Sequence, residues 1–95
     1  MHKNTIIETV VKKLNVSKIF NTDSTETLLI SLEKGATFPT HTSPKDALLV
    51  VLEGSINFFI NEQNILLESQ QVHTFSKEVS HYVTANQNTK FLIIR

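Results

Sequence analysis

The apolar residues near the start of the chain recur with the period of a helix. Five of them share one face at 3.6 residues per turn: Ile6, Ile7, Val10, Val11 and Leu14. Thr5 and Glu8 form a capping-box pattern, and Lys12 and Lys13 suit the negative end of a helix dipole. An edge strand is the alternative, because Ile, Thr and Val also favour strands. The pattern predicts a helical segment over residues 1–16.

From Ser17 onward the pattern changes to short apolar runs separated by polar turns. The predicted strands cover residues 18–20, 25–33, 47–53, 55–60, 65–68, 72–75, 82–85 and 91–94. Turn-forming residues separate them at 34–35, 54, 61–64 and 86–89. Strands at this spacing are typical of an antiparallel sandwich or barrel. We therefore predict one all-β domain over residues 1–95, with the helical segment at 1–16 and a small antiparallel β-barrel at 17–95.

One predicted strand is apolar at six consecutive positions. Residues 47–52 read Ala-Leu-Leu-Val-Val-Leu, so both faces of this strand should be buried. One face can line the interior of a barrel, and the other needs a cover, either the N-terminal helix or a second subunit. Residues 91–94 repeat the pattern at the C-terminus. We therefore expect a homodimer that forms through the outer faces of these strands.

Composition and charge exclude several classes of partner. The 95 residues allow one modest core, and nine basic residues balance nine acidic ones without a basic patch. We therefore expect no nucleic-acid partner and no membrane partner. There is no cysteine, so disulfide and thiolate chemistry are excluded. The N-terminus has no continuous apolar core, and no stretch approaches the roughly 20 apolar residues of a membrane span, which together predict a cytoplasmic protein.

Candidate chemistry begins with the segment from Gly35 to Gly54, which resembles the first sequence motif of the cupin superfamily. That motif is a glycine, five residues, His-x-His, an acidic or amide ligand, and a glycine after the strand. Here five residues separate Gly35 from His41, on a short polar turn, and Gly54 closes the motif at the expected distance. Ser43 stands at the second histidine position, and Ala47 stands where small cupins often carry Gln or Glu.

The second cupin motif is matched by residues 70–81, which keep its length and its terminal histidine, His81. The usual glycine, acidic residue and prolines of that motif are replaced. The resemblance covers about residues 25–95. It rests on the spacing of the glycines and histidines and on the apolar pattern of the strands between them. It implies a double-stranded β-helix, also called a jelly roll, of the small single-domain cupin type with a degenerate metal site.

Only part of the usual cupin metal centre is present. The family normally uses three histidines and one carboxylate or amide to hold a transition metal, and here His41 and His81 occupy two of these four positions. Strand alternation puts Asp46 on the face opposite Ala47, and His73 falls on a different strand from His81. We therefore expect no cofactor, with a divalent transition metal held by His41 and His81 as the alternative.

The remaining side chains favour a pocket that binds a small organic ligand of unassigned specificity. The expected pocket residues are His41, Ser43, Phe58, Phe75 and His81, with hydroxyls from Thr40, Thr42, Ser43 or Thr84. Aromatic walls with hydrogen-bonding groups suit a sugar or a small organic acid. Two other functions stay open: a metal-dependent dioxygenase or isomerase that uses His41 and His81, and a dimeric regulatory or structural module. No catalytic residue is assigned, and His41 can instead serve only to cap its turn.

Overall fold

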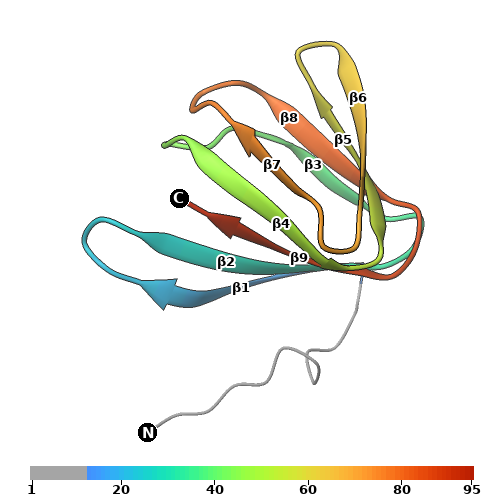
Figure 1. Ribbon diagram of the computed structural model, residues 1–95, viewed down its shortest axis with the longest axis horizontal. Coiled ribbons are helices and arrows are strands. Elements are labelled where there is room, and N and C mark those ends of the chain that lie inside the picture. The colour runs from blue at the N-terminus through green and yellow to red at the C-terminus, as the bar shows by residue number, and fades with distance from the viewer. Residues whose placement is uncertain (1–12) are drawn as a thin grey trace, which may run out of the picture.

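The computed structural model describes residues 13–95, which form nine strands and contain no helix (Figure 1). The strands are β1 (Leu14–Asn21), β2 (Glu26–Leu32), β3 (Thr37–His41), β4 (Ala47–Glu53), β5 (Ser55–Ile60), β6 (Gln63–Glu68), β7 (Val72–Phe75), β8 (His81–Ala85) and β9 (Thr89–Ile94). No helix in this part of the chain is long and apolar enough to cross a membrane.

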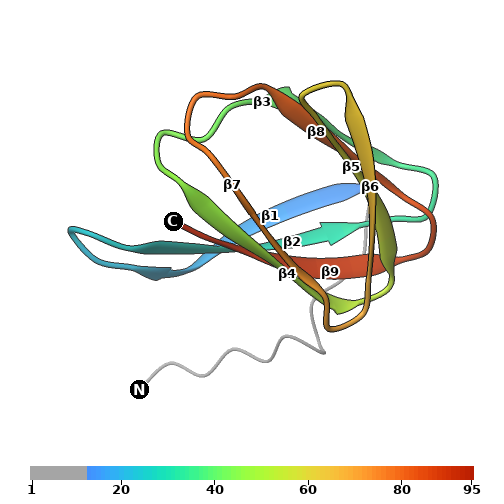
Figure 2. The ribbon, with the colours of Figure 1, turned by 45° about the horizontal axis from the view of Figure 1, so that its top comes forward.

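Two antiparallel sheets face each other and enclose the core (Figure 2). The five-stranded sheet has the order β1-β2-β9-β4-β7, and the four-stranded sheet has the order β3-β8-β5-β6. Side chains from both sheets fill the space between them, among them Ile30, Leu49, Val51, Ile56, Phe58, Val83, Phe91 and Ile93. The prediction of an all-β, two-sheet architecture is confirmed.

The eight strand ranges predicted from the pattern each overlap one observed strand, but β3 was missed. The segment around His41 was expected to be a polar turn, because Pro39 and Pro44 fix backbone angles on either side of its turn-forming residues. Proline also lacks the N–H that a neighbouring strand would accept. β3 lies at the edge of the four-stranded sheet, and its pairing with β8 shifts register between Phe38 and His41. An edge position with a bulge tolerates proline, so this expectation is corrected.

The predicted N-terminal helix lies almost wholly outside the described residues. Its last part, residues 14–16, belongs to β1, where Leu14 pairs with Leu32 and Val16 with Ile30 on β2. The strand begins before residue 17, so the expected boundary between helix and barrel is wrong at this point. Backbone pairing with β2 decides the conformation there, because the local sequence left both a helix and an edge strand open.

The apolar strand β4 alternates between two environments. Ala47, Leu49 and Val51 are buried in the core, whereas Leu48 and Val50 on the outer face are half-buried. The expectation that both faces are fully buried is therefore right only for the inner face. The homodimer expected from the outer face stays a prediction.

Candidate functional site

The structure brings His41 and His81 together at one end of the four-stranded sheet. The two residues are opposite each other in the antiparallel pairing of β3 with β8. Their Nε2 atoms lie 3.0 Å apart, and the rings meet edge to face with centroids 4.2 Å apart. The missed strand β3 is what carries His41 to this position. A pair separated by 40 positions in the chain is thus made adjacent by strand pairing.

Backbone carbonyl groups anchor the other nitrogen of each ring. Nδ1 of His41 lies 2.6 Å from the carbonyl oxygen of Pro39, and Nδ1 of His81 lies 2.9 Å from that of Val79. A carbonyl oxygen only accepts hydrogen bonds, so each Nδ1 carries a proton and donates it. His41 therefore bonds to neighbouring backbone, as one of the open alternatives held, but it does so from strand β3 and it also contacts His81.

These anchors determine what the contact between the two Nε2 atoms requires. A neutral imidazole has a single N–H, and here that proton lies on Nδ1, which leaves a lone pair on each Nε2. Two lone pairs at 3.0 Å repel each other unless a third proton lies between them. A hydrogen bond between the two Nε2 atoms therefore needs one proton more than two neutral imidazoles carry.

The surroundings of His81 oppose a positive charge on its ring. The His81 side chain is only 2% exposed and packs against the rings of Phe58 and Phe75. Burial lowers the pKa of His81, the charge of His41 lowers it further, and the hydrogen bond to the Val79 carbonyl acts in the opposite direction. Burial therefore disfavours the extra proton that a hydrogen bond between the two rings needs.

The aromatic residues expected to wall a pocket instead fill the interior. Phe58 is completely buried, and Phe75 is nearly so. Their rings contact each other as well as His81, with centroids 5.1 Å apart. Phe58 also contacts His73, on β7, at a centroid distance of 5.6 Å. The barrel centre around His81 is therefore packed with aromatic side chains.

The remaining positions of the cupin metal centre do not supply donors. Ser43 is buried, but its Oγ donates a hydrogen bond to the carbonyl oxygen of Lys45 at 2.6 Å. An Asp46 carboxylate oxygen accepts the backbone N–H of Lys77 at 2.9 Å. Within residues 13–95 no group of three or more His, Cys, Asp or Glu side chains could hold a metal ion. The residues present do not fit the four-ligand centre of the family.

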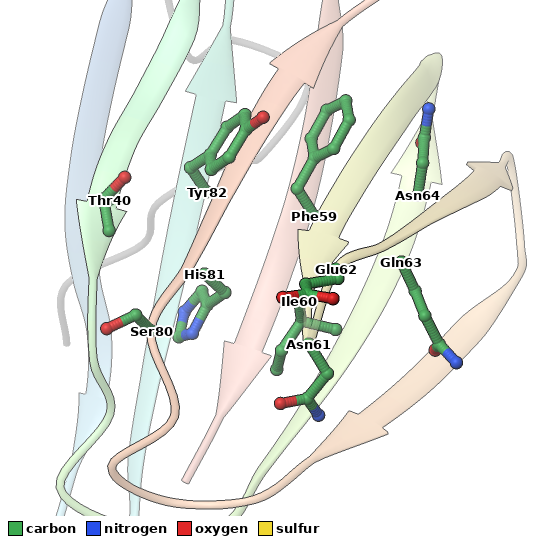
Figure 3. Close-up of a pocket in the computed structure, with 10 residues that line it drawn as sticks. All are labelled: Thr40, Phe59, Ile60, Asn61, Glu62, Gln63, Asn64, Ser80, His81 and Tyr82. Carbon is green, nitrogen blue, oxygen red and sulfur yellow. The ribbon is translucent and has the colours of Figure 1, made fainter.

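A pocket of about 480 Å³ opens beside His81, at the end of the four-stranded sheet where β5 turns into β6 (Figure 3). Its lining comes from all four strands and the turn between β5 and β6: Thr40, Phe59, Ile60, Asn61, Glu62, Gln63, Asn64, Ser80, His81 and Tyr82. Among the five expected pocket residues only His81 lines it, and Thr40 is the one expected hydroxyl that does.

Sequence reasoning missed most of this pocket because its two aromatic residues meet only through strand pairing. Phe59 and Tyr82 follow the alternation of β5 and β8, one position out of phase with the buried pair Phe58 and Val83. That alternation was a readable signal that both rings face outward. Their adjacency depends on the register of β5 against β8, which no local pattern contains.

Solved structures, cupins among them, resemble this chain over most of its length. A cupin superfamily protein from Desulfitobacterium hafniense DCB-2 is 20% identical with a TM-score of 0.83, over 93% of this chain and 81% of that chain. An RmlC-like cupin from Desulfovibrio desulfuricans is 19% identical with a TM-score of 0.85, over 99% and 94%. For KdgF from Halomonas sp. the identity is 12% and the TM-score 0.79, over 86% and 76%. No family model and no curated protein matches the sequence. The resemblance to cupins is confirmed as a likeness of fold.

Proposed function

We propose that this cupin-fold chain is a small-molecule-binding domain whose site is the pocket beside His81. The observation that carries the proposal is the pocket itself, about 480 Å³ in volume and lined by both apolar rings and polar side chains. Sites for small organic ligands commonly have volumes of roughly 300–1,000 Å³ and this mixture of groups.

The packed interior supports the same assignment. Phe58 and Phe75 pack against the His81 ring inside the barrel, and the proposed ligand therefore lies in the pocket that Phe59 and Tyr82 line. Thr40 and Ser80 offer hydroxyl groups there, and Asn61 adds an amide. These groups can orient a polar ligand, and none of them is a nucleophile paired with a base. The proposal is therefore a binding role without catalysis.

A ligand screen followed by nuclear magnetic resonance tests the proposal. We expect at least one compound of a polar fragment library to shift the backbone amide signals of residues 59–64 and 80–82. Thr40→Val removes a pocket hydroxyl with little change of shape and should weaken that compound. Thr37→Val makes the same change on β3 outside this pocket and should leave binding unaltered. Hits that shift signals elsewhere, or equal effects of the two variants, would contradict the proposal.

A metal-dependent enzyme is the second candidate, and one observation favours it. Imidazoles that bind metal usually donate their other N–H to a backbone carbonyl or a carboxylate, and both His41 and His81 do so. Two imidazole donors leave most of a coordination sphere to water, which favours weak binding. Metal analysis of protein purified without an affinity tag distinguishes the two candidates.

A further inference from the structure

We infer that the ligand of this pocket is an uncharged carbohydrate that packs against Phe59 and Tyr82 on the outer face of the four-stranded sheet. The inference rests on the proposed binding function and specifies the class of ligand. Its site lies on the opposite side of the sheet from the packed barrel interior.

The first support is a row of side chains that crosses all four strands. Thr40 on β3, Tyr82 on β8, Phe59 on β5 and Asn64 on β6 follow one another in the order of the sheet (Figure 3). Phe59 is directly opposite both Tyr82 and Asn64 in the strand pairing. The row therefore places two rings between a hydroxyl and an amide, on a surface that faces solvent.

The two rings form a rigid apolar platform. Phe59 and Tyr82 stack in parallel, with centroids 4.4 Å apart and planes inclined by 9°, and Tyr82 is 37% exposed. The stack covers one face of each ring, and the outer faces remain, that of Tyr82 toward Thr40 and that of Phe59 toward Asn64 (Figure 3). Aromatic faces carry negative charge density, so these outer faces attract the weakly positive C–H groups on the flat side of a sugar ring. An exposed aromatic pair beside polar groups therefore suits a ligand with one apolar face and many hydroxyls.

Free hydrogen-bonding groups surround this platform. Asn64 accepts a hydrogen bond from the amide of Asn57 through its Oδ1 at 2.9 Å, which fixes its orientation and leaves its own NH₂ group for a ligand. The lining contributes two further side-chain amides, Asn61 and Gln63, and the hydroxyls of Thr40, Ser80 and Tyr82. Amides and hydroxyls both donate and accept, as sugar hydroxyls also do.

The charges of the lining disfavour an ionic ligand. Among residues 13–95, no lysine or arginine lines the pocket, and Glu62 is its one carboxylate. The burial that lowers the pKa of His81 reduces the positive charge available there. An anionic sugar, such as a uronate or a sugar phosphate, would find a carboxylate and no fixed cation. The pocket therefore matches a neutral sugar better than a charged one.

Titration of ¹⁵N-labelled protein with a defined sugar panel tests the inference. The neutral probes are glucose, galactose, mannose and cellobiose, and the charged probes are glucuronate and glucose 6-phosphate. We expect at least one neutral sugar to shift signals of residues 59–64 and 80–82, with weaker binding of the charged ones. Tyr82→Ala should weaken binding about tenfold or more, since it removes half of the platform. Leu66→Ala shortens an exposed side chain on the same face outside the pocket and should have no effect.

The outcomes separate the inference from the proposed function. No binding of any neutral sugar, tighter binding of the charged sugars, or shifts confined to other residues would overturn the carbohydrate assignment. If a library compound of another class still binds this pocket, the proposed function stands and only the ligand class is wrong. Asn64→Ala provides a second variant at the other end of the row, in case Tyr82→Ala does not fold.

Discussion

The Nε2 atoms of His41 and His81 lie 3.0 Å apart, while the Nδ1 atom of each ring is held by a backbone carbonyl oxygen. This arrangement accommodates three protons, one more than two neutral imidazoles possess. A hydrogen bond between the two rings thus needs a positive charge, and the burial of His81 makes that charge costly.

The stability of the fold should depend on the protonation of His81. Burial lowers the pKa of His81 in the folded chain below the ordinary value of 6.5. The unfolded chain then binds more protons than the folded chain below pH 6.5, so the free energy of unfolding should rise as the pH rises to about 6.5 and then level off. Urea unfolding of the wild type and of His81→Gln between about pH 5 and 8 measures this. The same pH dependence in both proteins would exclude His81 as its source.

The metal content of the protein should be low. Because residues 13–95 offer only the His41 and His81 pair in place of four ligands, untagged protein should contain well under one equivalent of transition metal. Mass spectrometry of the metal content provides the measurement, and His41→Ala should leave it unchanged. A full equivalent that disappears in this variant would instead support the metal-dependent enzyme.

Acid should weaken the ion pairs of Glu26, on β2, with Lys18 and with Arg95 at the end of the chain. Hydrogen bonds from Lys18 and Arg95, each 2.8 Å long, lower the pKa of Glu26 from 4.5 to about 2. A lowered carboxyl pKa stabilises the fold above pH 4.5, and this contribution is lost as the pH falls towards 2. The stability difference between wild type and Glu26→Gln should shrink over this range. A difference that is constant with pH would contradict the role of the charge.

Gly54 should tolerate no side chain. Its φ is +104°, and an added Cβ would lie 2.7 Å from the carbonyl oxygen of Asn88 and still closer to Thr89 Oγ1. Gly54→Ala should therefore cost about 3 kcal/mol, from backbone strain and overpacking together. Gly35 also has a positive φ but open space around it, so Gly35→Ala should cost only about 1 kcal/mol. Equal losses of unfolding free energy in the two variants would show that packing against the 86–89 turn is unimportant.

The homodimer is the remaining prediction from the apolar pattern. The outer face of β4 presents Leu48, Val50 and Leu52, all half-buried, and Leu92 and Ile94 continue this face on β9. Light scattering at micromolar concentration should give twice the chain mass of 10.8 kDa. Exchange of Leu48 and Val50 for polar residues should shift the mass towards the monomer, with circular dichroism to check folding. A wild-type mass of 10.8 kDa would disprove it.

The sequence by itself determined the strands that alternation and turn residues mark. Local patterns predict the inner face of β4, because side-chain direction repeats every two residues in a strand. They also predict the turns at Gly35 and Gly54 and the cupin spacing that leads to His41 and His81. Strand β3 escaped this reading because proline is acceptable there only at a sheet edge.

Only the tertiary structure decided which side chains from different strands contact each other. The contact of His41 with His81 depends on the pairing of β3 with β8, and the platform of Phe59 and Tyr82 depends on the register of β5 against β8. The packing of Phe58 against His81 depends on how the interior fills. These are contacts between segments distant in the chain, so the local periodicity that predicts each strand contains no information about them.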